Sequence, residues 1–332
     1  MKKNVLIITG LALVSCFTAC TQNLDKEYVK GQEQEIELRP MMLGGDVETK
    51  AIDSASGMNT TDYTLHVNAH HSSVGSYFRN ALFGWQSSTF KGGTASSPNP
   101  KYWPLNGNLD LIAYNDFTTG GQTSSPSTSD CSSITVSCNS SASSQLDLCV
   151  GRADDATSGG LNMTFYHTKA KVKVAVVATS GAQYRDVGGT LYGLKINSIT
   201  ISGMNLDGTV TATGSSDAAT WSSQSGAEDL TFSGGGAFNL STSAQTFTNE
   251  YLVPEQSGNK TATVNYTLYS GTDASGNQIS LNSTVTKTFD CILSDKEGKI
   301  VTYTFNFASL NEITINPSVT AWSTDGSTVS IP

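Results

Sequence analysis

The dominant pattern along the chain is a short-range alternation of apolar and polar residues, which is the period expected of β-strands. In residues 62–71, for example, Tyr63, Leu65, Val67 and Ala69 fall on one face of an extended segment. Similar runs, separated by Gly, Pro and Asn turns, occupy residues 33–42, 77–86, 109–117, 145–155, 161–179, 191–205, 262–270, 286–294 and 299–315. No segment has a sustained helical period, and short strands with turns at regular intervals are typical of β-sandwiches. The predicted fold is therefore all-β.

A Gly-rich break at residues 180–190 separates these runs into two groups. We therefore predict two tandem β-sandwich domains, an N-terminal one over residues 51–180 and a C-terminal one over residues 181–332. Residues 20–50 precede the first sandwich and are interpreted as a polar tether followed by one strand. Residues 118–144 are rich in Ser, Thr and Gly, and we interpret them as a long surface loop.

The composition narrows the class of protein. The chain has 332 residues, of which 37% are hydrophobic, so it can bury a sizeable core. Only 14% of the residues are charged, and the net charge is −9. An acidic chain without a basic patch argues against a nucleic-acid partner. Ser, Thr, Gly and Asn occur in place of charged residues, and this composition is typical of exported all-β proteins with polar strand faces.

The first residues predict export. Lys2 and Lys3 precede an apolar run that is too short to span a membrane and has the shape of a signal peptide, residues 1–19. The stretch FTAC, ending at Cys20, resembles the lipobox of bacterial lipoproteins, in which the cysteine becomes the acylated first residue. We predict lipidation, including palmitate, at Cys20 and an outer-membrane location; Cys16, which ends LVSC, and an ordinary cleaved signal remain alternatives. Two or three acyl chains on one residue anchor a protein stably.

Four cysteines follow the signal segment: Cys131, Cys138, Cys149 and Cys291. Export permits disulfides. Cys131 and Cys138 flank six residues, a spacing that a hairpin or loop staple can use, so we predict that these two pair if any two do. No Cys-x-x-Cys pattern occurs, so the cysteine spacing indicates no zinc site.

Neither a metal site nor a catalytic site is predicted. His66, Asn68 and His70 share one strand face, but no third ligand of suitable type lies nearby in the sequence. The Gly-rich residues 233–238 lack the Lys-Ser/Thr of a phosphate loop, and no Gly-x-Ser-x-Gly elbow is present. We therefore expect no cofactor, no metal and no enzymatic activity.

Aromatic residues suggest a different kind of function. Tyr102, Trp103, Trp221 and Trp322 each lie beside a predicted strand. Exposed, they could form a sugar-stacking platform; buried, they would belong to the core. A monomeric surface lipoprotein that binds glycans through residues such as Trp103 is accordingly the alternative function, and a surface hydrolase ranks last.

Several segments, read in order, resemble one known family. They are TKAI at residues 49–52, YWPLNGNLDLIAY at 102–114, FYHTKAKVKVAV at 165–176, SITISGM at 198–204, YLVPEQ at 251–256, GKIVTYTFNF at 298–307 and ITINPSVTAW at 313–322. This series resembles the fimbrillins, lipoprotein-derived subunits of type V pili in Gram-negative bacteria. The resemblance spans nearly the whole chain after the signal segment.

The resemblance implies two transthyretin-like β-sandwich domains and a structural subunit of cell-surface fimbriae that contributes to adhesion and colonisation. Its implied partners are other fimbrial subunits, the outer membrane through the lipid anchor, and ligands on host or bacterial surfaces. In the family, a trypsin-like protease removes the first strand of shaft subunits, and the groove left behind accepts a strand of the next subunit.

The expected cut lies between Lys50 and Ala51. Residues 33–42 would be the removable first strand, with Ile36, Leu38 and Met42 directed into the core and an interruption at the proline; the linker that follows contains two glycines. The family's usual cut follows Arg, so the lysine is a departure. The alternative interpretation is a solvated linker charge.

Residues 165–176 predict one apolar face and one polar face on a single strand. The core face comprises Ala170, Val172 and Val174, and the solvated face comprises Lys169, Lys171 and Lys173. His167 is interpreted as a structural histidine at the edge of this strand.

Overall fold

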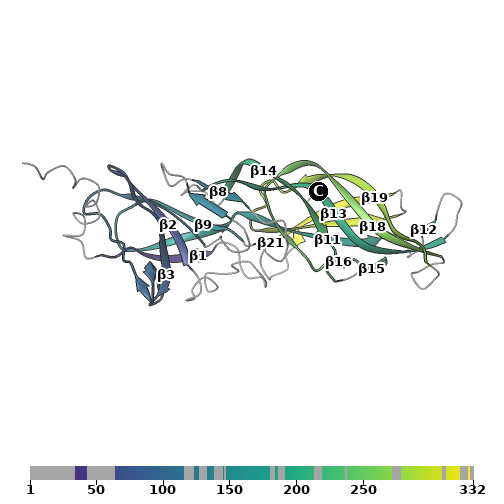
Figure 1. Ribbon diagram of the computed structural model, residues 1–332, viewed down its shortest axis with the longest axis horizontal. Helices are drawn as coiled ribbons and strands as arrows, with labels where there is room; N and C mark the ends of the chain where they lie inside the picture. Colours follow the sequence, from purple (N-terminus) through teal and green to yellow (C-terminus); the bar gives the residue numbers. More distant parts are fainter. Residues whose placement is uncertain are drawn as a thin grey trace, which may run out of the picture.

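The chain folds into an elongated all-β molecule with two β-rich units arranged end to end (Figure 1). The computed structural model describes residues 34–42, 64–115, 123–126, 133–137, 145, 147–179, 184–185, 191–212, 219–235, 238–270, 278–308, 312–321 and 328–329. Within these ranges the regular elements are all strands, which confirms the all-β prediction. None of the described residues forms a helix long and apolar enough to cross a membrane.

The first unit is one sheet of eight strands. They are β1 (Glu37–Met42), β2 (Thr64–His71), β3 (Gly75–Gln86), β4 (Thr89–Thr94), β5 (Ser97–Pro98), β6 (Leu109–Asn115), β9 (Cys149–Ala156) and β10 (Gly160–His167). Their order in the sheet is β1-β10-β9-β6-β2-β3-β4-β5. Strand β1 runs parallel to β10 and also meets β4 where Leu38 pairs with Phe90. The sheet therefore closes on itself through β1.

The alternating residues of these strands form the first core. Leu109, Leu111 and Ala113 lie on its inner side, as their spacing predicts. The intervening Ile112 and Tyr114 are also buried, in a separate cluster with side chains of the second unit. Strand β6 is thus covered on both faces, which explains its nearly continuous apolar sequence.

The second unit has two sheets facing each other. One contains β11 (Lys169–Ala178), β16 (Gln245–Thr246), β17 (Tyr251–Pro254), β20 (Lys299–Phe307), β21 (Ile313–Ala321) and β22 (Thr328–Val329). The other contains β7 (Thr123–Pro126), β8 (Ser133–Ser137), β12 (Tyr184–Arg185), β13 (Leu191–Ala212), β14 (Ala219–Phe232), β15 (Phe238–Asn239), β18 (Ser257–Ser270) and β19 (Gln278–Ile292). A large apolar core lies between them, with the inward residues of β11 and β20 against those of β13 and β18.

Strands β7 and β8 correct the interpretation of residues 118–144 as one long surface loop. Strand β8 pairs with β13 from Gly208 to Thr211, and β7 pairs with β8. Ile134 of β8 is fully buried between the two units. These strands are short and polar, and their pairing depends on β13, which is distant in sequence.

The hydrogen-bonded pairings place β11 in a sheet of the second unit, parallel to β20 over Lys171–Ala178. The division of the chain into domains at residue 180 stays a prediction, as does the transthyretin-like detail of the strand arrangement. Thr168 alone connects β10 of the first unit to β11 of the second.

Candidate functional site

The first candidate site is the set of residues that contact β1 and the segment just before it, called here the seat of β1. Ile36 and Leu38 are fully buried in the first core, in agreement with their alternation. Strand β1 continues through Pro40, whose Cα lies opposite Met163 of β10. A proline is tolerated here because β1 has an extensive partner on one side only.

The segment before β1 is held by backbone hydrogen bonds to residues 101–103. The amide of Ile36 donates to the carbonyl of Lys101 (2.7 Å), and the amide of Trp103 donates to the carbonyl of Gln34 (3.2 Å). The Trp103 ring is fully buried, and its Nε1 donates to the carbonyl of Gly159 (3.2 Å). Trp103 therefore forms a wall of the seat.

Ion pairs connect Lys91 of β4 to β1 and to the segment before it. The Lys91 ammonium lies 2.7 Å from a Glu37 carboxylate oxygen and 3.6 Å from one of Glu35. The hydrogen bond to Glu37 is the main cause that raises the pKa of Lys91 above its ordinary value, against partial burial. These contacts are partly exposed, so they orient β1 more than they stabilise it.

Several predicted sites lie outside the described residues. They are the lipidation candidates Cys20 and Cys16, the cleavage pair Lys50 and Ala51, the disulfide candidates Cys131 and Cys138, and Trp322. Met42 ends β1, but its side chain is also outside the described part.

Among the described residues, the two tryptophans of the aromatic platform are not exposed as the glycan-binding alternative requires. Trp103 is buried in the first core, and Trp221 is 8% exposed. The Trp221 Nε1 donates to the carbonyl of Thr168 (2.5 Å), which ties β14 to the crossing between the units. Of the two alternatives given for these residues, Trp103 and Trp221 take the buried one, because both indoles fill space between strands.

The histidines of β2 do not converge on a shared point. His66 Nδ1 is 2.6 Å from Asn80 Oδ1, and the His66 ring stacks on Tyr114. The Asn68 side chain accepts a hydrogen bond from the amide of Asn80 (2.8 Å). These contacts assign structural roles to His66 and Asn68.

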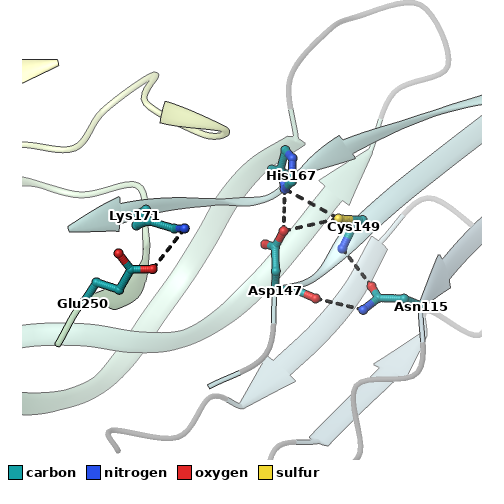
Figure 2. A network of polar contacts seen from close by, with 6 residues as sticks. All are labelled: Asn115, Asp147, Cys149, His167, Lys171 and Glu250. Atoms are coloured by element: carbon teal, nitrogen blue, oxygen red, sulfur yellow. Dashed lines mark hydrogen bonds and ion pairs between the residues drawn. The ribbon is translucent and has the colours of Figure 1, made fainter. Parts of the chain in front are cut away.

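A second cluster lies where the chain passes from the first unit to the second (Figure 2). Cys149 begins β9 and His167 ends β10, and the two residues face each other across this antiparallel pair. Asp147 lies two residues before Cys149, so its side chain extends to the same side. The exposed fractions of Asp147, Cys149 and His167 are 2%, 0% and 3%.

The three side chains are in mutual contact. Cys149 Sγ lies 3.3 Å from Asp147 Oδ2 and 3.7 Å from His167 Nδ1, and His167 Nδ1 makes a short contact with the same Asp147 oxygen. Asn115 fixes the backbone below them: its Oδ1 accepts from the amide of Cys149, and its Nδ2 donates to the carbonyl of Asp147, both at 2.8 Å.

Two opposing effects set the charge of Asp147. Burial, the larger single effect, raises the pKa of a carboxyl group. The interactions with His167, with smaller contributions from Lys169 and Cys149, outweigh it together and lower the pKa of Asp147 below its ordinary value. The carboxylate is therefore charged in the interior.

This arrangement is not a catalytic triad. In a triad, the nucleophile and the orienting carboxylate contact opposite nitrogens of the histidine. Here the Cys149 thiol and the Asp147 carboxylate both approach Nδ1. The cluster thus lacks the path along which a proton leaves the nucleophile.

Next to the cluster, two lysines of β11 overturn an expectation. Lys169 and Lys171 are 0% and 1% exposed, not solvated. The Lys171 ammonium lies 3.0 Å from a Glu250 carboxylate oxygen, and Lys173, which is half-buried, lies 3.2 Å from the other (Figure 2). The polar face of β11 is covered by chain segments distant in sequence, so its alternation alone could not show that it is buried.

The sequence interpretation of His167 as a structural histidine did not include its two partners, Asp147 and Cys149. The usable signal was the pattern Asp-x-Cys at the start of one strand and a histidine at the end of the next. Among the described residues, only Asp147, Cys149 and His167 form a group of three potential metal ligands.

With this geometry in view, comparisons with known proteins identify the class. A fimbrillin-like family model matches residues 49–322, so the chain belongs to the fimbrillin-like family. Membership supports a non-enzymatic fimbrial or adhesion-type protein of the cell surface. No curated protein sequence matches the chain significantly.

Two solved structures share the fold. One is a fimbrial protein from Bacteroides vulgatus, with 15% identity, 87% of this chain and 100% of that chain covered, and a TM-score of 0.58. The other is a candidate cell adhesion protein from Bacteroides ovatus, with 13% identity, 88% and 99% coverage, and a TM-score of 0.51. At these identities the likeness establishes the architecture alone.

Proposed function

We propose that this protein is a structural subunit of cell-surface fimbriae, assembled by exchange of its first strand for a strand of another subunit. The observation that carries the proposal is the seat of β1: a short strand with one extensive strand partner, in which Leu38 and the directly preceding Ile36 are fully buried. Family membership supports the same role.

Removal of β1 would leave a groove that needs a replacement. Burial of Ile36 and Leu38 is worth roughly 1.5–3 kcal/mol each. Without them, apolar walls that include Phe90 and Trp103 would face water, and the edge of β10 would lose its backbone partner. An extended strand from a second subunit restores both kinds of contact.

The remaining parts of the proposal concern processing and location. The cut falls after Lys50, in the linker between β1 and β2, and Cys20 carries the lipid that holds the precursor at the outer membrane. Adhesion to host or bacterial surfaces belongs to the assembled filament. The glycan-binding alternative loses the exposed Trp103 on which it depended.

The test compares Lys50→Ala with Lys50→Arg in cells that lack the wild-type gene. Filaments, seen by negative-stain microscopy, should be lost with alanine and kept with arginine, which a trypsin-like protease also accepts. Amino-terminal sequencing of the assembled protein should begin at Ala51. Normal filaments from Lys50→Ala with residues 33–42 still attached would overturn the proposal.

A further inference from the structure

The cluster of Asp147, Cys149 and His167 has no part in the exchange of β1. It includes His167, the last residue of β10, two residues beyond the pairing of β1 with that strand, which ends at Phe165. Figure 2 shows the three side chains together. Its three side chains offer one sulfur, one nitrogen and one oxygen atom, and the ligand atoms lie within 4.8 Å of one another. Zinc accepts all three kinds of donor.

The spacing of the donors suits a tetrahedral ion. Zinc–sulfur bonds of about 2.3 Å and zinc–nitrogen or zinc–oxygen bonds of about 2.1 Å place two ligands of one tetrahedral ion roughly 3.4–3.6 Å apart. Cys149 Sγ is 3.3 Å from Asp147 Oδ2 and 3.7 Å from His167 Nδ1. Only the short contact between His167 and Asp147 must open, and both side chains end in rotatable bonds.

Asp147 carries an independent sign of a missing partner. Its Oδ1 atom is buried and has no hydrogen-bond partner among the described residues. A buried charged oxygen without a partner is costly. A cation bound to Oδ2 can also bind Oδ1, because carboxylates bind metals through one oxygen or both.

The residues around the cluster already hold the ligands in place. Asn115 fixes the backbone on both sides of the Asp147–Cys149 segment. From the second unit, the amide of Gly298 donates to the carbonyl of Lys169 (3.0 Å), and a Cβ at Gly298 would lie 3.4 Å from His167 Cδ2. Such supporting contacts orient metal ligands and tune the site.

We propose that Asp147, Cys149 and His167 bind one zinc ion that fastens the crossing between the two units. On binding, the Cys149 thiol releases its proton to solvent, and the His167 imidazole binds through Nδ1 in its neutral form, with its proton on Nε2, so that bonds to zinc replace the contact between His167 and Asp147. Zinc, thiolate, carboxylate and neutral imidazole sum to zero charge. Lys169 is the opposing charge nearby, and it limits the affinity. The spacing of the cysteines could not indicate this site, because its ligands come from the start of β9, the segment just before it and the end of β10.

The experiment uses the mature chain without a histidine tag, depleted of metal and then titrated with Co²⁺ as a spectroscopic probe. We expect a thiolate-to-cobalt charge-transfer band that saturates at one ion per chain and is displaced by Zn²⁺. Zinc should also raise the Tm.

Variants assign the band to this cluster. Cys149→Ser retains a hydrogen-bond donor of similar size and should remove the band, and His167→Gln should weaken it. Two controls should keep the band: Cys291→Ser, at the other buried cysteine outside a disulfide, and the double variant Cys131→Ala/Cys138→Ala. The wild-type titration decides the matter even if a variant does not fold. No band in the wild type, or a band that survives Cys149→Ser, would mean that the cluster is a hydrogen-bonded network only.

Discussion

Strands β1 and β11 share one local feature and differ in everything around it. Each pairs in parallel with one neighbour, β1 with β10 and β11 with β20. On its other side, β1 meets β4 at one residue pair, whereas β11 is flanked by β16 and β17. The same type of pairing thus occurs at the closing edge of one sheet and in the interior of another.

The difference concerns how much of the fold depends on each strand. Strand β1 and the residue before it contribute Leu38 and Ile36 to a core that other strands largely enclose. Strand β11 contributes the alternating residues Ala170, Val172, Val174, Val176 and Ala178 to the second core, and Lys169 and Lys171 on its other face are buried as well. Loss of β1 is therefore a local event, and loss of β11 is a global one. A subunit that exchanges a strand needs this asymmetry.

The largest expected effect comes from a charge in β11. Val174→Asp places a carboxylate in the second core without a partner, and we expect a loss of about 4 kcal/mol or more in the free energy of unfolding. Chemical denaturation followed by circular dichroism measures it. Thr284→Asp, at an exposed position of β19, is the control and should change stability by less than about 0.5 kcal/mol. Equal effects at both positions would contradict the central role of β11.

A smaller and more local effect is expected from Leu38→Ala. Truncation of a fully buried leucine lowers stability by about 2–5 kcal/mol, but here we expect it to weaken only the packing of β1. Hydrogen exchange should accelerate in β1 and β10, with exchange in β11 and β20 unchanged. Equal acceleration in β11 would show that β1 is not separable from the rest of the fold.

The sequence predicted these two strands unequally well, for physical reasons. Alternation identified the inward faces of both β1 and β11, because a strand turns successive side chains to opposite sides. It could not show that Lys169 and Lys171 are covered, since burial of the second face depends on segments distant in sequence. The strands around Ile134 were missed because short polar strands carry almost no apolar signal.

The two candidate sites also differ in how far the sequence could predict them. The seat of β1 could be inferred from Ile36 and Leu38, which lie in one continuous segment. The contact of Asp147 and Cys149 with His167 requires the register between β9 and β10, and no local pattern fixes that register.

The smallest expected effect is a pH dependence confined to the β11 side. Glu297 lies in the turn before β20, and the next residue, Gly298, donates its amide to the carbonyl of Lys169 in β11. Burial, followed by the hydrogen bond to Glu255 and the charges of Glu255 and Asp295, raises the pKa of Glu297 from 4.5 to about 7. Between these two values the folded protein binds a proton that the unfolded chain lacks. The stability contributed by this group is therefore full below pH 4.5, falls as the pH rises, and is lost above about pH 7.

Glu297→Gln should remove this slope and make the variant more stable than the wild type at pH 8, by less than about 1 kcal/mol after solvent screening. Thermal unfolding from pH 5 to pH 8 measures the difference, with Glu228→Gln, at an exposed glutamate of β14, as the matched loss of one carboxylate. Hydrogen exchange in β1 should show no corresponding change between the wild type and Glu297→Gln. If the variant keeps the wild-type slope, Glu297 is not the group that causes this pH dependence of stability.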